Sequence, residues 1–312
     1  MIIEHLEEFY RREAAARNKE PRNVFRASSA GYCERRLGYE KLGVQGDPLT
    51  PRRLSVFRHG TAIDGALKID LQLALNDKFL NLDALRRNEC EIEGVTVSFT
   101  PDGAFQNGGE AIGIVEIKTM SDYAFDRACK GEIDRSYLCQ AWVYAYGTSF
   151  NPVVFICYRK ETSHMVELVF DKNQKEKIVV QRYGNDALEL AINEPLMLAE
   201  IKTPFDPSVE EEVRGKFKRL AELESVNDLA PGVRAIGPEV VKIQGKAKAI
   251  EAEAEYGPPE KVGGSWFTFH TPRKIAGFPC SYCPMIKKCL NAKLEITHGR
   301  PTWVIEDPEM VT

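Results

Sequence analysis

The most constraining feature of the sequence is the segment GIVEIKTM, residues 113–120, which begins apolar and ends charged. A short apolar run of this kind predicts a buried β-strand. Side chains two positions apart on a strand point to the same face, so Glu116 and Lys118 share one face while Val115 and Ile117 face the core. The two charged side chains are therefore expected to point together into one cleft.

A second carboxylate precedes this strand at a fixed spacing. Asp102 lies in the turn-forming sequence PDG and gives the pattern D-x13-E-x-K with Glu116 and Lys118. An adjacent strand ending at Asp102 would bring both carboxylates to one place, where they would form a hard oxygen site for Mg2+ or Mn2+. A lysine beside them can orient or activate a water and stabilise phosphate charge. By itself this pattern is weak evidence of a catalytic site, because charged residues on exposed strand faces are common.

The rest of the chain alternates between helical and extended patterns. Amphipathic or charged periodicity predicts helices over 2–17, 54–75, 134–147 and 172–200, and two charged helical segments within 207–256. Ser28 or Ser29 could cap a short helix that ends at Gly43. Strands are expected within 90–105 around Gly94, over 152–159 and 165–170 as a hairpin, and over 265–269. The expected fold class is α/β, with a central mixed sheet flanked by helices.

Length and composition limit the class of protein. The chain has 312 residues, of which 43% are hydrophobic and 28% charged, and we expect a single domain of ordinary globular composition. It contains no apolar run of about 18 residues, and its N-terminus is charged, so we expect no membrane span, no signal peptide and a cytoplasmic location. A net charge of −4 argues against a protein that coats nucleic acid passively, although a basic face remains compatible with it.

Seven of the eight cysteines fall into two groups. Cysteines in a cytoplasmic protein are more often metal ligands, catalytic groups or buried thiols than disulfides. The spacing C-x2-C-x5-C, with a proline next to each of the first two cysteines, predicts a loop that points thiolates at one centre, one ligand short of a four-thiolate site. This group consists of Cys280, Cys283 and Cys289, whereas Cys90, Cys129, Cys139 and Cys157 are scattered among apolar residues and expected to be buried.

Several further motifs occur in a characteristic order around the D-x13-E-x-K pattern. GTAID at 60–64 precedes it, Gln140 and Tyr144 follow as Q-x3-Y on one helix face, and Cys33 lies far upstream of the three late cysteines. In this order the motifs resemble the PD-(D/E)xK nuclease superfamily, in particular its iron–sulfur branch. That branch includes CRISPR-associated iron–sulfur exonucleases, phage-encoded relatives and the nuclease domain of AddB-type helicase–nucleases. The resemblance covers about residues 26–160 and 275–292.

The resemblance implies a restriction-endonuclease-like core at about 50–205. It implies cluster-binding segments at about 26–45 and 275–292, joined by a [4Fe–4S] cluster, and leaves a helical insertion at about 205–270. It also implies roles for individual residues. The metal ligands would be Asp102 and Glu116, Lys118 would be the catalytic lysine, Gln140 and Tyr144 would line the DNA cleft, and Cys33, Cys280, Cys283 and Cys289 would hold the cluster.

One position departs from the family pattern. The family usually carries G-x3-H at its first motif, whereas this chain has Gly60 followed by Asp64 in the histidine position. His59 lies one residue before the glycine, about 140° around a regular helix from Asp64, so both cannot face the same metal. We expect Asp64 to be the ligand, because it keeps the four-residue spacing and supplies an oxygen suited to Mg2+ or Mn2+.

These features predict a metal-dependent deoxyribonuclease, an exonuclease that acts on DNA ends or single strands in recombination, repair, or phage or CRISPR DNA processing. Its partners would be DNA and recombination or helicase proteins. One alternative is a catalytically weak or inactive DNA-binding accessory protein on the same fold. Another is a zinc protein in which the four thiolates bind Zn2+.

Overall fold

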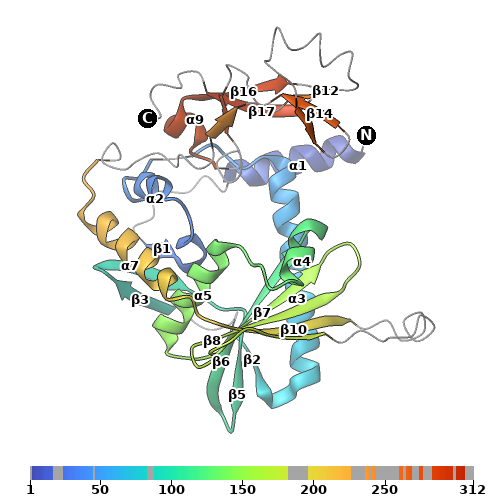
Figure 1. Ribbon diagram of the computed structural model, residues 1–312, viewed down its shortest axis with the longest axis vertical. Coiled ribbons are helices and arrows are strands. Elements are labelled where there is room, and N and C mark those ends of the chain that lie inside the picture. The colour runs from blue at the N-terminus through green and yellow to red at the C-terminus, as the bar shows by residue number, and fades with distance from the viewer. Residues whose placement is uncertain are drawn as a thin grey trace, which may run out of the picture. The chain divides into compact units, whose positions relative to one another are not determined.

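A computed structural model of the chain describes residues 2–16, 24–44, 46–82, 88–181, 196–225, 236–238, 241–243, 260–262, 265–268, 274–276, 283–297 and 300–305 (Figure 1). Its contacts divide the chain into two compact units. The first unit consists of Met1–Arg17, Arg22–Tyr32 and Thr50–Glu222, and the second of Asn18–Pro21, Cys33–Leu49 and Leu223–Thr312.

A mixed seven-stranded sheet forms the core of the first unit, in the order β2-β5-β6-β7-β8-β10-β9. Its strands are β2 (Phe79–Asn81), β5 (Gly103–Asn107), β6 (Glu110–Met120), β7 (Val153–Arg159), β8 (Met165–Asp171), β9 (Ile178–Gln181) and β10 (Met197–Pro204). β6 runs parallel to β7 and β8 parallel to β10, and the other neighbouring strands are antiparallel. The central pair is completely buried at Ile114, Val115, Val153 and Phe155, as expected of strands covered on both faces.

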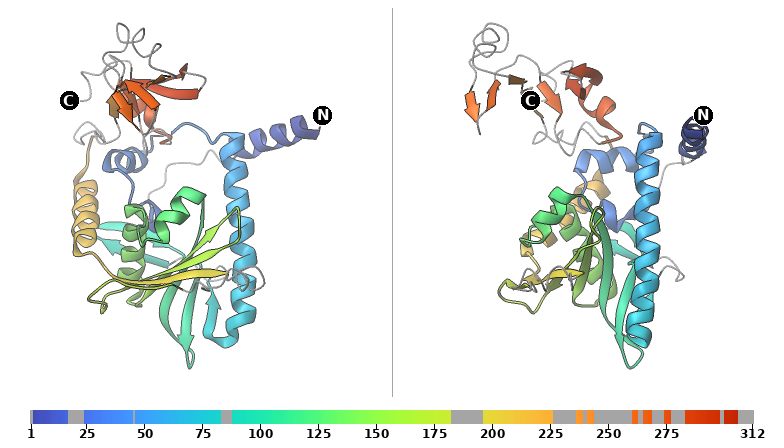
Figure 2. Two further views of the ribbon diagram at one scale, coloured as in Figure 1. Left: turned by 45° about the vertical axis from the view of Figure 1, so that its right-hand side comes forward. Right: turned by 90° about the vertical axis from the view of Figure 1, so that its right-hand side faces the viewer.

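Two long helices cover opposite faces of this sheet. α3 (Pro51–Leu75) comes close to β6 at Gly60, where an added Cβ would lie 3.4 Å from Thr119 Oγ1. α5 (Arg135–Thr148) contacts the same strand through Gln140, which donates a hydrogen bond to Glu116. Residues 116 and 119 are three positions apart on the strand, so their side chains point to opposite faces. Figure 2 shows the two helices on the two sides of the sheet.

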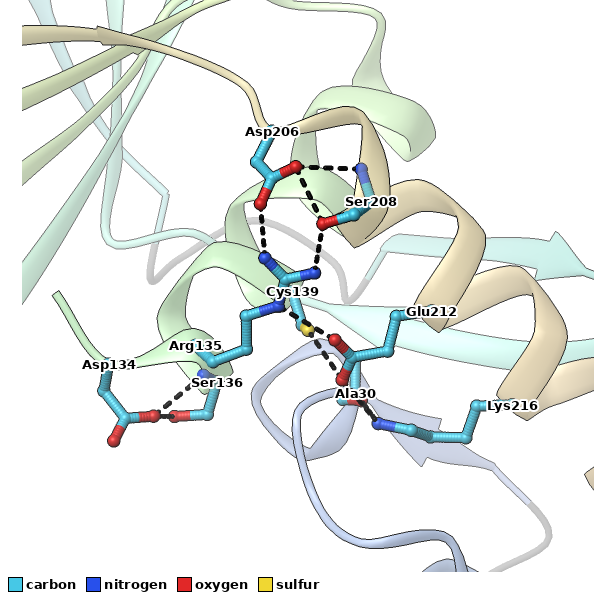
Figure 3. A network of polar contacts seen from close by, with 9 residues as sticks. All are labelled: Ala30, Asp134, Arg135, Ser136, Cys139, Asp206, Ser208, Glu212 and Lys216. Atoms are coloured by element: carbon cyan, nitrogen blue, oxygen red, sulfur yellow. Dashed lines mark hydrogen bonds and ion pairs between the residues drawn. The ribbon is translucent and has the colours of Figure 1, made fainter. Parts of the chain in front are cut away.

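An ionic network fixes α5 against α7 (Pro207–Glu222), which ends the first unit. The Arg135 guanidinium donates to Asp206 at 2.6 Å, to Ser208 at 2.7 Å and to Glu212 at 2.8 Å (Figure 3). Glu212 also accepts from Lys216, whose ammonium donates to the Ala30 carbonyl at 2.8 Å. The network therefore ties α5 to α7, and α7 to the segment that precedes residue 33.

A small second sheet, β1-β4-β3, completes the first unit. It contains β1 (Phe25–Arg26), β3 (Asn88–Ile92) and β4 (Val95–Phe99). The buried Ser98 hydroxyl donates to the Phe25 carbonyl at 3.0 Å and so supplements the short β1–β4 pairing. The short helix η1 (Ala27–Ser29) follows β1 directly and packs against α5.

The second unit joins residues 33–49 to the C-terminal part of the chain. It contains α2 (Glu34–Lys41), α9 (Ile286–Leu290) and short antiparallel strands: β11 (Ile236–Pro238), β12 (Val241–Ile243), β13 (Glu260–Val262), β14 (Ser265–Thr268), β15 (Lys274–Ala276), β16 (Ala292–Thr297) and β17 (Arg300–Ile305). Ile286, Leu290, Ala292 and Ile305 form a buried apolar cluster between α9 and its neighbouring strands.

Most of the predicted elements are confirmed. The expected helices at 2–17, 54–75 and 134–147 correspond to α1 (Ile2–Ala16), α3 and α5, and the first charged helical segment corresponds to α7. The strand at 113–120, the two strands around Gly94, the hairpin β7–β8 and the strand β14 are also present. The α/β class, with a central mixed sheet flanked by helices, is therefore correct.

Two predicted elements and one predicted helix cap are wrong where the structure describes them. The expected helix over 172–200 contains β9 and the start of β10, because pairing with β8 and with each other overrides local helix propensity. The expected second helical segment within 207–256 contains β11 and β12 in its described residues. The short helix α2 is capped by the Cys33 thiol, which accepts from the Arg36 amide, and not by a serine. No helix among the described residues is both long and apolar enough to cross a membrane.

The glycine of the PDG sequence supports the core, and this gives a first prediction. A Cβ at Gly103 would overlap the buried Phe79 ring and lie 3.2 Å from the Leu80 carbonyl oxygen. We expect Gly103→Ala to lower the free energy of unfolding by about 1–3 kcal/mol through overpacking. The matched control is Gly65→Ala in α3, where no atom lies within 4 Å of the added methyl and helix propensity favours alanine by up to about 1 kcal/mol.

Urea unfolding of both variants measures the difference. Gly103→Ala should unfold at lower urea than the wild type, and Gly65→Ala at equal or higher urea. A Gly103→Ala protein as stable as the wild type would show that the Phe79 ring can move aside at no cost.

Candidate active site

β6 places Glu116 and Lys118 on one face, as the alternation predicts. The Lys118 ammonium donates to Glu116 Oε1 at 2.7 Å. Glu116 is only 6% exposed and lies deep in the fold, whereas Lys118 is partly accessible. The Lys118 ammonium also lies 4.8 Å from the centre of the Tyr137 ring, a cation–π contact that the sequence analysis did not anticipate.

α5 supplies the other partners of Glu116. Gln140 donates to Glu116 Oε1 at 2.8 Å, and the Tyr144 hydroxyl donates to Glu116 Oε2 at 2.9 Å. Gln140 Oε1 in turn accepts from Lys118 at 3.0 Å, so the amide connects both charged groups. Both oxygens of the buried carboxylate are therefore held by hydrogen bonds, which fixes the orientation of Glu116.

Burial and neighbouring charges set the ionisation of this cluster. Burial raises the pKa of Glu116, and the Lys118 ammonium beside it opposes that shift. Burial by itself would lower the pKa of Lys118, but the Glu116 carboxylate raises it above the ordinary value. Lys118 is therefore a protonated hydrogen-bond donor at neutral pH and not a free base.

Asp102 lies in the turn between β4 and β5, next to the middle of β6. Its Oδ2 accepts from the Ile117 backbone amide at 2.7 Å, which aligns the carboxylate with the neighbouring strand. The Asp102 charge is close enough to Glu116 to contribute to raising its pKa. The second carboxylate thus reaches the region of Glu116 from a turn that precedes a strand, and not from a strand end.

Asp64 is connected to Asp102 through a buried lysine that the sequence analysis missed. The Lys68 ammonium contacts Asp64 Oδ2 and Asp102 Oδ1, each at 2.8 Å, and Lys68 is 3% exposed. His59, the other residue considered at this motif, is exposed on α3. The spacing D-x3-K was visible in the sequence, because residues four apart lie on one helix face, but lysine is rarely buried.

A cleft of about 490 Å³ opens over the Glu116 cluster. Its walls carry a guanidinium and several hydroxyl groups in addition to the residues already named. The full lining is Arg26, Ala27, Ser28, Ser98, Phe99, Thr100, Glu116, Lys118, Gln140 and Tyr144. Arg26 and Ser28 come from the β1–η1 segment, which the sequence analysis did not connect to the site. A cleft with cationic and hydroxyl groups beside a carboxylate can bind an oxyanion such as a phosphodiester.

The chain contains a second copy of the tetrapeptide EIKT, which shows what distinguishes the site. Glu200 and Lys202 on β10 form an ion pair at 3.1 Å with the same spacing as Glu116 and Lys118. The Lys202 side chain is 47% exposed, compared with 16% for Lys118. The local sequence is therefore not sufficient, and the hydrogen bonds from α5 distinguish the first copy from the second.

The carboxylates are divided between two ammonium groups. Asp64 and Asp102 contact Lys68, and Glu116 contacts Lys118. Within the described parts of the chain, no group of three or more His, Cys, Asp or Glu side chains is arranged to hold a metal. Two carboxylate oxygens nevertheless converge on one cation, the Lys68 ammonium. Carboxylate oxygens are also the donors that hard divalent cations prefer.

Three of the four predicted cluster cysteines lie in the second unit around one small apolar cavity. The cavity is lined by Cys33, Arg36, Cys283, Met285, Ile286, Cys289 and Leu290. Burial raises the pKa of Cys289 to about 11, and charges at Cys33 and Cys283 contribute to the shift. Cys280 lies outside the described residues. The other cysteines of the sequence analysis divide into Cys139 and Cys157, which are buried, and Cys90 and Cys129, which are half-buried.

Three contacts hold the two cysteine-bearing segments together. The Asp47 amide donates to the Pro284 carbonyl at 2.7 Å, and the Tyr39 hydroxyl donates to the Lys288 carbonyl at 3.2 Å. The Lys287 ammonium lies 3.3 Å from the Asp47 carboxylate. Segments about 250 positions apart in sequence thus bring three thiols to one cavity, a donor set that suits iron–sulfur or zinc.

Comparison with known proteins gives only distant structural likenesses. No family model matches the chain, and no curated protein matches it by sequence. Among solved structures, it is similar to SSO0001, with 16% identity, a TM-score of 0.43 and coverage of 72% of this chain and 88% of that one. It is also similar to an alkaline exonuclease (LHK-Exo) from Laribacter hongkongensis, with 14% identity, a TM-score of 0.36 and coverage of 69% and 93%. The complex of LHK-Exo with dAMP gives 14% identity, a TM-score of 0.38 and coverage of 67% and 91%. All three TM-scores are below 0.5, so the proposed function depends on the geometry of the site.

Proposed function

We propose that this protein is a metal-dependent deoxyribonuclease of the PD-(D/E)xK type, with a restriction-endonuclease-like core. The main support is the buried cluster in which Gln140, Tyr144 and Lys118 hold Glu116 at the floor of a cleft. Burying a carboxylate in this way is costly unless each of its oxygens is satisfied. Such a cost is typical of functional sites, where perturbed pKa values concentrate.

The donor chemistry of three carboxylates suits a divalent cation of the Mg2+ or Mn2+ type, although among the described residues they do not surround one common centre. Asp102 and Glu116 would hold it, with Asp64 as a third carboxylate. A divalent ion bound there would act as a Lewis acid toward the phosphoryl oxygen of the substrate. The carboxylates come from α3, the β4–β5 turn and β6, so their approach depends on the folded first unit.

The protein side chains would have separate tasks in phosphodiester hydrolysis. Lys118, protonated and held by Glu116 and Gln140, would orient the attacking water and stabilise negative charge on the phosphoryl oxygens. Tyr144 and Gln140 keep Glu116 in one rotamer by their hydrogen bonds. Arg26 and the hydroxyls of Ser28 and Thr100, on the cleft wall, would bind flanking phosphates.

The cysteine cavity of the second unit would hold a [4Fe–4S] cluster. Cys33, Cys283 and Cys289 provide three soft thiolate ligands around one cavity, and Cys280 would be the fourth. Zn2+ is the competing occupant, because it accepts the same four thiolates. The cluster would have a structural role, linking two segments that are distant in sequence.

A nuclease assay on the full chain tests the proposed function. We expect linear DNA labelled at either end to be shortened from the end in Mn2+ or Mg2+ and to remain intact in EDTA. Covalently closed circular DNA should remain intact, because an exonuclease requires an end. Matched single- and double-stranded linear substrates would show which of the two the enzyme prefers. Intact linear DNA in Mn2+, or equal cleavage in EDTA, would contradict the proposal.

A further inference from the structure

Lys68 holds an unusual position among the carboxylates of the site. Its ammonium lies 2.8 Å from Asp64 Oδ2 and 2.8 Å from Asp102 Oδ1, and the residue is almost completely buried. A lysine is buried at a reasonable cost only when its charge is paired. Both of its partners are carboxylates that the proposed function assigns to a metal. Lys68 therefore occupies the space between two of the three proposed ligands.

The helix that carries Lys68 is well anchored. Thr50 caps the start of α3 by accepting from the Arg53 amide, and Pro51 occupies its first turn. Asp64 precedes Lys68 by one helical turn, so both side chains lie on the same face of α3. The ammonium thus links α3 to the turn that holds Asp102. Asp102 Oδ2 remains directed at the Ile117 amide while Oδ1 accepts from Lys68.

The charges of the site favour a single divalent ion. With all five groups ionised, three carboxylates and the two ammonium groups of Lys68 and Lys118 give a net charge of −1. One divalent ion together with one phosphodiester charge would bring the site to neutrality. A second divalent ion would leave two uncompensated positive charges in a partly buried site, where Coulomb repulsion is poorly screened.

We infer that Lys68 is a resident cation that takes the place of a second divalent ion, so that the site binds one metal ion. This inference rests on the proposed metal-dependent function. Lys68 is a positioning residue in this view, because it acts through Asp64 and Asp102 and does not touch the substrate. The site would then hold one exchangeable cation, the metal ion, and one cation fixed in the fold, the Lys68 ammonium.

Equilibrium dialysis against Mn2+, without DNA, counts the ions bound to the full chain. We expect one ion per wild-type chain and one per Lys68→Arg chain, which keeps the charge. Lys68→Met keeps an unbranched side chain but vacates the position between Asp64 and Asp102, and its site with two ions would carry one positive charge less than the wild-type site with two ions. We therefore expect this variant to bind two ions. The matched control is Arg58→Met, which removes one positive charge from an exposed position on the same helix and should bind one ion.

The thermal unfolding midpoint provides a second measurement. Lys68→Met should unfold at a lower temperature than the wild type without metal, because Asp64 and Asp102 lose their shared cation. Excess Mn2+ should raise its midpoint more than it raises that of the wild type. A residue that only packs in the core would lower the midpoint equally in both conditions.

The number of Mn2+ ions bound per chain distinguishes a failure of this inference from a failure of the proposed function. Two ions on the wild type, or one ion on a folded Lys68→Met, would overturn the role of Lys68 and leave the nuclease proposal intact. A wild type that binds no Mn2+ would contradict the proposed function and this inference with it. If Lys68→Met does not fold, the number of Mn2+ ions bound to the wild type still tests the inference, because two bound ions would overturn it.

Discussion

Lys118→Met is expected to slow DNA cleavage by roughly 10²–10³-fold, the usual cost of losing one preorganised donor to transition-state charge. The ammonium is held by Glu116 and Gln140 and faces the cleft, which no other described lysine lines. The protein should remain folded, because Glu116 keeps its hydrogen bonds from Gln140 and Tyr144.

The second EIKT copy supplies the control for this prediction. Lys202→Met makes the same substitution in the same tetrapeptide of the same sheet, but at an exposed ion pair that has no hydrogen bond to α5 among those the structure describes. Single-turnover cleavage of an end-labelled oligonucleotide in Mn2+ measures both variants. Lys202→Met should cleave at the wild-type rate. An equal loss of cleavage rate in the two variants, or no loss of rate in Lys118→Met, would show that Lys118 has no special role.

Cys33→Ser is expected to prevent binding of the proposed iron–sulfur cluster and to destabilise the second unit. A link between residues 33 and 283 closes a loop of 250 positions. Covalent closure of a loop of more than 100 residues lowers the entropy of the unfolded chain and so raises its free energy by roughly 5 kcal/mol at 25 °C. Serine keeps the size of the side chain but is a poor ligand for the soft iron or zinc centres that thiolates prefer. We expect colourless protein with a lower unfolding midpoint.

Iron and sulfide analysis of anaerobically purified protein measures this directly. The matched control is Cys129→Ser, at a half-buried cysteine on the first unit that is distant in sequence from the cysteine cavity. It should keep the iron content and the brown colour of the wild type. Wild-type protein with stoichiometric zinc and no iron would establish a zinc centre and contradict the assignment of an iron–sulfur cluster.

The sequence predicts the central part of the site because its signals are local. The alternation in residues 113–120 fixes the shared face of Glu116 and Lys118, and the spacing of Gln140 and Tyr144 fixes one face of α5. The contact between those two faces could be expected only from the order of the motifs. The structure provides it as three hydrogen bonds between β6 and α5.

Three features that the sequence did not predict depend on tertiary contacts. From the sequence alone Lys68 is expected to be a solvated lysine, because its partner Asp102 is 34 positions away. Arg26 reaches the cleft only because β1 pairs with β4. β10 has local helix-forming residues but pairs on both sides, with β8 and β9. In each case the deciding interaction joins residues that no window of the sequence contains together.

In the proposed function, the Glu116 carboxylate is part of a metal-dependent DNA-cleaving site. The most direct test is single-turnover cleavage of an end-labelled oligonucleotide in Mn2+ by the wild type and by Glu116→Gln, with Glu200→Gln as the matched change in the second EIKT copy. Glutamine keeps the size of the side chain but removes its charge. The predicted result is a loss of at least about 100-fold for Glu116→Gln and wild-type rates for Glu200→Gln. Cleavage by folded Glu116→Gln at the wild-type rate would contradict the assignment of this site.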